Sequence, residues 1–226
     1  MYSDPDKFKN RSVDFYAKIF IVPEKDDKGT YIQAYANNDD SKNTLITIVD
    51  PKLDVKQDDV IHVVGTVNKE FEGENALGGT VNAPIILASK VEKTDYATAF
   101  APAIKTIEVN KEINQHGYII KLNKVELAEK ETRLYIKINN TSKEKVSFYS
   151  FNANVVQGSK QFKESDNYDE VVPELDSEIL PGVDQEGVLI FEPVRVDGEN
   201  LKIILDGTSD NYELNFDPFT FEAILK

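Results

Sequence analysis

The stretch VDFYAKIFIV, residues 13–22, decides the fold class. Its odd-numbered positions are all apolar, and they alternate with positions that include Asp14 and Lys18. A period of two, built from β-branched and aromatic residues, is typical of a strand with one buried face. We therefore expect one long strand over residues 13–22.

The same alternation recurs four times before residue 95, with turn residues such as 37–40 in between. The predicted strands are residues 13–22, 31–35, 44–49, 60–67 and 85–91. Gly65 lies inside the fourth strand and predicts a bulge or sharp bend, because it has no Cβ. The Gly-rich run 73–79 predicts a loop. Strands this short and this closely spaced favour a small, sharply bent barrel.

Residues 94–105 change character, because they are rich in Ala and show no alternation. We read them as the connection between two domains, with a helical turn. Short strands resume beyond them, interrupted by a long acidic loop over residues 164–181. The predicted strands begin at residue 107 and continue at 117–127, 133–138, 146–156, 188–191, 201–205, 212–216 and 219–225.

This second set of strands, spaced by turn signals, favours an antiparallel sandwich of the immunoglobulin type. The expected fold is thus all-β, with a barrel followed by a sandwich. The expected boundaries are residues 1–95 for the barrel, 96–106 for the linker and 107–226 for the sandwich.

The charge balance bears on the partners. The chain has 226 residues, with 26 Lys and Arg against 40 Asp and Glu, for a net charge of -14. Such a surface repels phosphate backbones and anionic lipid headgroups. Nucleic acid is therefore not expected as a partner, and we expect membrane contact only through an anchor that this chain does not contain.

Catalytic residues are hard to find in this sequence. The chain has no Cys, which excludes thiolate nucleophiles and Cys-type zinc sites. Its two His residues, His62 and His116, fall in different predicted domains, and neither neighbours a nucleophile motif. We expect no enzymatic activity, no catalytic residue and no cofactor.

Two acidic segments, residues 166–178 and 206–211, offer oxygen ligands for a cation. Neither follows the EF-hand spacing, so we read them as a solvated loop and a hairpin turn and assign no metal site. Structural Ca²⁺ at these loops is the alternative. The run 73–79 lacks the Lys of a phosphate-binding loop and carries Glu74.

Residues 12–93 resemble a small bacterial OB-fold domain. The resemblance rests on the long first strand, on the run DDVIHVVGTV at residues 58–67, and on APIILA at residues 83–88. Asp58 stands where such barrels usually have Gly, and the usual helix between the third and fourth strands is reduced to residues 51–57. An OB-fold implies a ligand face on its second and third strands.

Residues 107–225 are similar to the DUF4352 family of exported proteins of Gram-positive bacteria. The carrying residues are LYIKINNTSKE at 134–144, then LPG at 180–182 and GVLIFE at 187–192. The resemblance implies an immunoglobulin-like sandwich on lipoproteins and other membrane-anchored proteins. The family has no established catalytic residues, so it implies none here.

The candidate ligand-binding residues are Tyr31, Tyr35 and Phe71. Tyr31 and Tyr35 lie four apart on one predicted strand and therefore share a face, and Phe71 is expected nearby. Aromatic residues without a basic groove fit a protein or cell-wall ligand better than a nucleic acid. Contact is expected through this face or by strand addition at an edge of the sandwich. The alternative is binding of an oligosaccharide or single-stranded nucleic acid by the barrel.

The expected location is extracellular or at the bacterial cell envelope. Residues 1–6 lack the basic and apolar segments of a signal peptide. The chain is therefore expected to be either a cytoplasmic protein or the trimmed soluble part of a longer envelope protein. The second resemblance favours the envelope.

Overall fold

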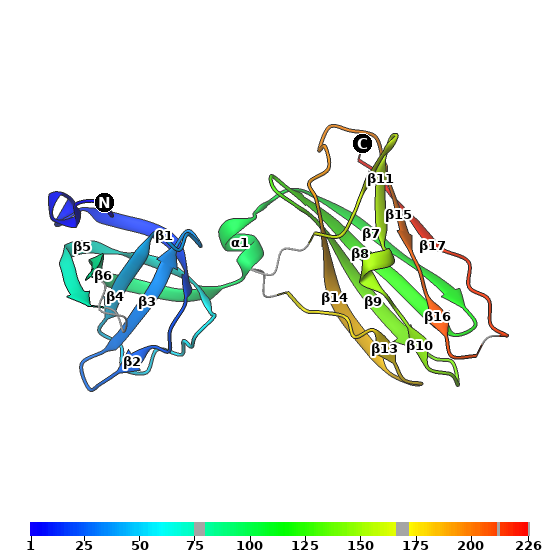
Figure 1. The fold of residues 1–226 in the computed structure, drawn as a ribbon, viewed down its shortest axis with the longest axis horizontal. Coiled ribbons are helices and arrows are strands. Elements are labelled where there is room, and N and C mark those ends of the chain that lie inside the picture. Colours follow the sequence, from blue (N-terminus) through cyan, green and yellow to red (C-terminus); the bar gives the residue numbers. More distant parts are fainter. Residues whose placement is uncertain (75–79, 166–171, 212, 226) are drawn as a thin grey trace. The chain divides into compact units, whose positions relative to one another are not determined.

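The computed structural model describes residues 1–74, 80–165, 172–211 and 213–225, and the remaining positions are outside the description that follows. The chain divides into two compact units, Met1–Phe100 and Ala101–Lys226 (Figure 1). The described residues are almost entirely strands and loops, so the predicted all-β fold is confirmed. Within the described residues, no helix combines the length and the apolar character needed to cross a membrane.

The first unit is a closed barrel. Its five main strands are β1 (Ser12–Ile19), β3 (Thr30–Ala36), β4 (Asn43–Ile48), β5 (Val60–Glu74) and β6 (Thr80–Thr94). They follow the order β1-β5-β6-β4-β3, and pairing of β1 with β3 closes the ring. Only the β4–β6 pair is parallel among these pairings. The short strand β2 (Glu24–Lys25) extends β3, and the 3₁₀-helix η1 (Pro5–Phe8) precedes the barrel.

The barrel interior is aliphatic because inward positions alternate along each strand. Ile19, Ile32, Ile46, Ile61 and Ile86 each come from a different strand and are almost fully buried. The predicted bulge at Gly65 is confirmed, since the β5–β6 register shifts between Val64 and Gly65. A Cβ at Gly65 would stand 2.6 Å from the carbonyl oxygen of Leu87.

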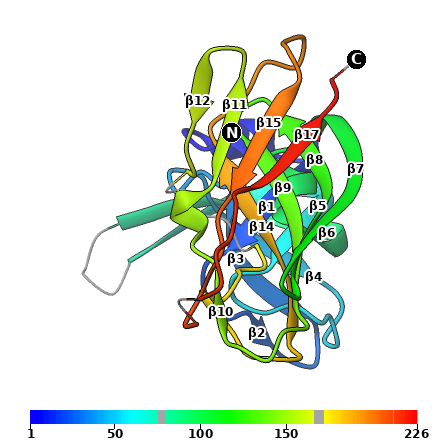
Figure 2. The ribbon, with the colours of Figure 1, turned by 90° about the vertical axis from the view of Figure 1, so that its right-hand side faces the viewer.

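The second unit is a sandwich. One sheet has the order β14-β9-β8-β7, from strands β7 (Ala103–Gln115), β8 (Tyr118–Ala128), β9 (Thr132–Asn140) and β14 (Asp184–Phe191). The facing sheet has the order β12-β11-β15-β17, from β11 (Asn154–Gln157), β12 (Lys160–Phe162), β15 (Leu201–Leu205) and β17 (Phe219–Ala223). Figure 2 shows these last four strands side by side.

A small third sheet lies at one end of the sandwich. It consists of β13 (Glu178–Ile179), β10 (Val146–Ser147) and β16 (Thr208–Ser209). One continuous core joins both large sheets, with Leu122, Ile136, Phe191, Ile203 and Phe219 at its centre. The interdigitated inner faces make this unit an immunoglobulin-like sandwich.

Several predicted strands differ from the observed ones. The predicted strand 13–22 ends at Ile19: β5 begins at Val60, opposite Lys18, and the first residues of β3 pair with β2 instead. The predicted strand 146–156 is broken into β10 and β11 by the 3₁₀-helix η2 (Ser150–Asn152). The predicted strand 212–216 is wrong over its described part, since residues 213–218 form no strand.

The strands β5 and β6 are longer than predicted and form a hairpin that includes Gly73, which was assigned to a loop. Residues 75–79 of that predicted loop lie outside the described residues, as do 166–171 of the predicted acidic loop and Tyr212. A short helix, α1 (Tyr96–Phe100), falls in the range predicted as linker, and β7 begins at Ala103 inside the same range. The β-branched residues Ile104, Thr106 and Ile107 account for this earlier start.

Candidate ligand-binding groove

The outer face of β3 carries both predicted tyrosines. Thr30, Ile32, Ala34 and Ala36 point into the barrel, so Tyr31 and Tyr35 point outward together with Gln33, as the alternation predicts. Among the five main strands of the barrel, β3 and β4 are the second and third in chain order, and they are neighbours in the sheet. This is the face that OB-folds use for ligands.

A groove with a volume of about 300 Å³ lies against this face. Its apolar lining includes the outward-facing side chains of Ile21, Val22, Tyr31, Leu45, Phe71 and Ile85, together with the buried Ile32 and Ile46. The segment before β2, strands β3, β4 and β6, and the β5 arm of the long hairpin all contribute. The groove therefore has the strand and loop origins expected of an OB-fold ligand site.

Strand register explains how these side chains meet. Gln33 on β3 stands opposite Leu45 on β4, and Leu45 stands opposite Ile85 on the parallel neighbour β6. Phe71 stands opposite Ala83 on β6, two residues before Ile85. The lining thus forms one row across the adjacent strands β3, β4 and β6, and Phe71 on the β5 arm of the hairpin extends it.

The structure brings Tyr31 and Phe71 together but places Tyr35 elsewhere. Tyr35 is not among the residues that line the groove. Its ring stacks on Phe20 instead, with centroids 4.1 Å apart and an interplanar angle of 12°. The candidate residues therefore form two features on one face: a groove at Tyr31 and Phe71, and a stacked pair at Tyr35.

The Tyr31 side chain is held by the turn that precedes β3. Its hydroxyl donates to the carboxylate of Asp26, at 3.1 Å from Oδ2. Asp26 also accepts from the backbone N–H groups of Lys28 and Gly29, at 2.8 and 3.0 Å. These donors, the Lys28 N–H first, lower the pKa of Asp26, and the carboxylate raises the pKa of Tyr31.

The polar lining of the groove is sparse. It consists of Glu24, Gln33 and Thr47, and Glu24 is the only charged residue among the described residues that line it. A ligand with phosphate groups would meet no cation in this lining. The groove is suited to apolar groups, with a few hydrogen bonds at its edge.

The residues Ile21, Val22, Leu45 and Ile85 were not predicted for this site. Residues 21 and 22 were assigned to the buried first strand, whereas Ile21 is 46% exposed and Val22 is 66% exposed. Pro23 was the available signal, because it has no N–H to donate to a ladder and restricts the residue before it.

The two histidines have local structural roles. His62 lies 2.6 Å from Asp14 and packs on the ring of Tyr16. His116 contacts the carbonyl oxygen of Asn215 at 3.1 Å and lies edge-on to Phe216. They belong to different units, as the sequence places them.

The acidic segment 206–211 is engaged in packing and pairing. Gly207 packs against the ring of Tyr118, and Asp210 pairs with Lys145 at 3.1 Å. Over the described parts of the chain, no cluster of three or more His, Asp and Glu side chains is placed to hold a metal ion. Residues 166–171 of the other acidic segment are outside the described residues.

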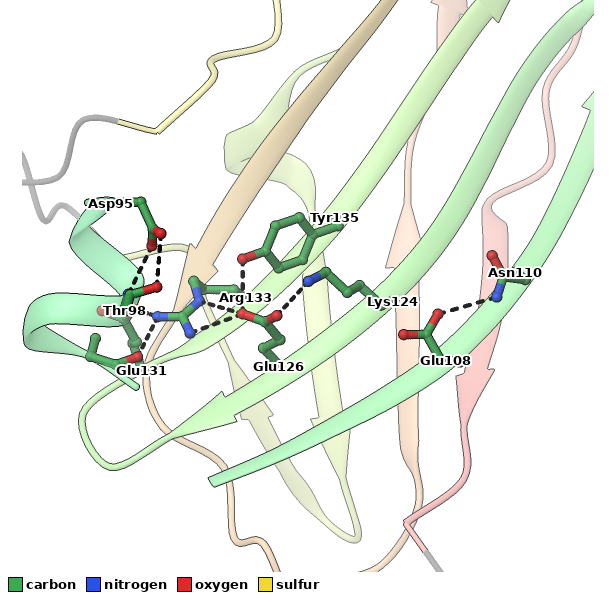
Figure 3. Close-up of polar contacts among 10 residues, drawn as sticks. Asp95, Thr98, Glu108, Asn110, Lys124, Glu126, Glu131, Arg133 and Tyr135 are labelled. Carbon is green, nitrogen blue, oxygen red and sulfur yellow. Dashed lines mark hydrogen bonds and ion pairs between the residues drawn. The ribbon is translucent and has the colours of Figure 1, made fainter. Parts of the chain in front are cut away.

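The sandwich contains a buried ionic cluster that the sequence did not predict (Figure 3). Arg133, only 1% exposed, donates from Nε and Nη2 to Glu126 at 3.1 and 2.9 Å and also pairs with Glu131. Lys124 and Tyr135 bind the same Glu126 carboxylate at 2.5 and 2.8 Å. Arg133 Nη1 also donates to the carbonyl oxygen of Ala101 at 2.8 Å.

These contacts fix the first residues of the second unit onto its sheet. Burial of Tyr135, followed by its bond to Glu126, raises the pKa of Tyr135 to about 12. Every described charged group of the cluster has an opposite charge in contact, so it is a structural feature rather than a reactive site.

Comparison with known proteins gives little beyond these observations. No protein-family model matches the chain, and no curated protein matches it. A solved structure, a functionally unknown protein from Listeria monocytogenes EGD-e, aligns over 56% of this chain and 88% of its own, with 11% sequence identity and a TM-score of 0.40.

Proposed function

We propose that this chain is a non-catalytic binding protein of the bacterial cell envelope, and that its barrel groove contacts a protein or cell-wall ligand. The observation that carries the proposal is the convergence of Tyr31 and Phe71 in one apolar groove on the β3–β4 face. Exposed apolar area gathered in a concave site is the usual mark of a binding surface.

The envelope location is supported by the resemblance of residues 107–225 to DUF4352 domains of exported Gram-positive proteins. A protease added to intact cells that express the full gene product tests it. Digestion of the protein while a cytoplasmic marker survives is the expected result. Protection until the cells are lysed would contradict the location without touching the binding role.

Binding to the cell wall is tested by co-sedimentation with purified peptidoglycan. We expect the wild-type chain to sediment with the peptidoglycan and the variants Tyr31→Ser and Phe71→Ser to remain in the supernatant. Phe151→Ser is the matched control, because Phe151 is 74% exposed on the second unit and lies away from the groove residues in sequence. Equal sedimentation of all four proteins would exclude the groove as the wall-binding site.

A neutral oligosaccharide is the second candidate ligand, and the stacked pair Phe20–Tyr35 favours it. Flat aromatic surfaces bind sugar rings through their apolar faces, without requiring a cation. If so, titration with chitin oligosaccharides should show a larger loss of affinity for Tyr35→Ser than for Phe71→Ser, each compared with the wild-type chain. A single-stranded oligonucleotide should give no gel shift at low salt, since the lining offers no cation.

A further inference from the structure

The groove gathers partly exposed apolar side chains on a strongly acidic chain. Ile21, Tyr31 and Phe71 are 46%, 36% and 40% exposed, while the chain carries a net charge of -14. Removing these side chains from water would favour association with other apolar groups.

The polar lining argues against a sugar in the groove itself. A sugar brings many hydroxyl groups, each of which loses water on binding and needs a partner. Apart from Tyr31, whose hydroxyl already donates to Asp26, the polar side chains among the described lining residues are Glu24, Gln33 and Thr47. Aliphatic side chains of a peptide need no such partners, so they match the lining better.

The charge placed at the groove is acidic, because Glu24 lines it and Asp26 accepts a hydrogen bond from Tyr31 of the lining. Segments 24–28 and 69–72 hold five acidic and three basic residues. One of the three, Lys25, donates to the carbonyl oxygen of Leu53 at 2.5 Å. Asp26 is fixed beside Tyr31 by its bonds to that hydroxyl and to two backbone N–H groups.

We propose that the groove binds a cationic peptide segment, in which apolar side chains contact Tyr31 and Phe71 while flanking Lys or Arg residues pair with Glu24 and Asp26. This inference rests on the proposed binding role of the groove and names its partner class. The charge is opposite to that of the nucleic acids that many OB-folds bind, and the pairing would add on-rate and specificity to the apolar contact.

The probe for a test is a rhodamine-labelled peptide of ten residues, in which three Lys alternate with Leu and Phe and Gly fills the spaces. Versions with Glu or Ser in place of Lys keep the same apolar side chains. Fluorescence anisotropy with the full chain at low salt should rank the three peptides as Lys over Ser over Glu, with about tenfold between the first two.

Variants separate the groove from the general negative charge of the chain. Glu24→Gln combined with Asp26→Asn removes both negative charges but keeps one acceptor oxygen on each side chain, enough at position 26 for the N–H groups of Lys28 and Gly29. It should weaken binding of the Lys peptide by several-fold. Phe71→Ser should weaken both the Lys and the Ser peptides. Glu112→Gln combined with Glu222→Gln removes the same charge from the second unit and should leave binding unchanged.

If the Glu112 and Glu222 double variant loses as much affinity for the Lys peptide as the Glu24 and Asp26 double variant, the net charge of the chain attracts the peptide and the proposal is wrong. A Glu peptide that binds as tightly as the Lys peptide would also overturn it. If the Lys peptide does not bind but Phe71→Ser still fails to co-sediment with peptidoglycan, the proposed function stands and this inference fails. If the Lys peptide does not bind and no groove variant affects peptidoglycan, both fail.

Discussion

Tyr118 has a buried polar atom that lacks a hydrogen-bond partner among the described residues. This atom is the hydroxyl oxygen, in the sandwich core, and burial raises the pKa of Tyr118. Its ring packs edge-on against Phe216 and Phe219. The packing of the ring therefore stabilises the core, whereas burial of the unpaired hydroxyl lowers the free energy of unfolding.

Tyr118→Phe should therefore leave the free energy of unfolding unchanged or raise it by up to about 1 kcal/mol. Tyr135→Phe is the matched control, because the Tyr135 hydroxyl donates to Glu126 at 2.8 Å and its loss should cost about 1–2 kcal/mol. Urea unfolding followed by circular dichroism measures both. A Tyr118→Phe chain that is the less stable of the two would show that the hydroxyl has a partner.

Asn140 differs from Tyr118, because every polar atom of its buried side chain forms hydrogen bonds. Nδ2 donates to the carbonyl oxygens of Glu144 and Ile179 at 2.8 and 2.9 Å, and Oδ1 accepts from the N–H and hydroxyl of Ser142 at 3.0 and 2.6 Å. The residue is fully buried. One side chain thus ties the end of β9 to the start of the third sheet.

Asn140→Ala should lower the free energy of unfolding by about 2–4 kcal/mol, because it leaves buried carbonyl and N–H groups without partners. Asn139→Ala, one residue earlier on β9, is the control and should change stability little. Thermal unfolding of the two variants makes the comparison. Similar melting temperatures would mean that water or neighbouring groups replace the Asn140 bonds.

At the scale of elements, the sequence predicts strands well where burial enforces the alternation. The strand predicted at 31–35 lies within β3, and the one predicted at 133–138 lies within β9. Prediction is poorer where pairing alone holds the chain. Residues 69–74 contain four charged positions, yet they pair with β6 out to Glu74.

Breaks in strands also escape the pattern. Residues 146–156 contain no Gly or Pro that would mark a break, yet η2 turns the chain from the third sheet into the β11 sheet. A change of sheet depends on which neighbours are available, and the sequence of one segment does not record them. The Gly65 bulge was predictable because a glycine inside a strand pattern is typical of a bulge.

Gly65→Ala should lower the stability of the barrel by about 2–3 kcal/mol, since the added methyl group meets the backbone of Leu87 and Ala88 at 2.6 and 2.9 Å. Gly182→Ala is a contrasting variant: nothing lies within 4 Å of its Cβ, but its φ is +79°, so it should cost only about 1 kcal/mol. Calorimetry ranks the two, and a larger loss at Gly182 would contradict the steric account.

At the scale of the whole molecule, Tyr31 and Phe71 were predictable as candidates on one face, but the groove that they line was not. Tyr31 follows from its place on the predicted strand 31–35 and from the resemblance to OB-folds, whereas Phe71 lies outside the predicted strands and was only expected nearby. The lining by Leu45 and Ile85 depends on the parallel pairing of β4 with β6, a contact between segments forty residues apart. Such a register is a property of the closed barrel rather than of either strand.

The two units should respond separately to acid, because the ionic cluster belongs to the second unit alone. Burial acts to raise the pKa of Glu126, but its bonds from Lys124, Tyr135 and Arg133 outweigh burial and hold the pKa below its ordinary value. A lowered folded-state pKa contributes stability that is complete above the unfolded value, about 4.3. That stability is lost as the pH falls through the folded value.

Glu126→Gln should therefore cost the sandwich about 2–3 kcal/mol at neutral pH, because Arg133 stays buried with one carboxylate partner fewer. The difference from wild type should stay constant from neutral pH down to the unfolded-state value of about 4.3 and shrink below it, as the pH falls through the lowered pKa of folded Glu126. Calorimetry of the full chain measures it, with Gly65→Ala marking the barrel transition. A difference that is constant with pH, or a shift of the marked transition, would show that the cluster does not stabilise the sandwich through the Glu126 charge.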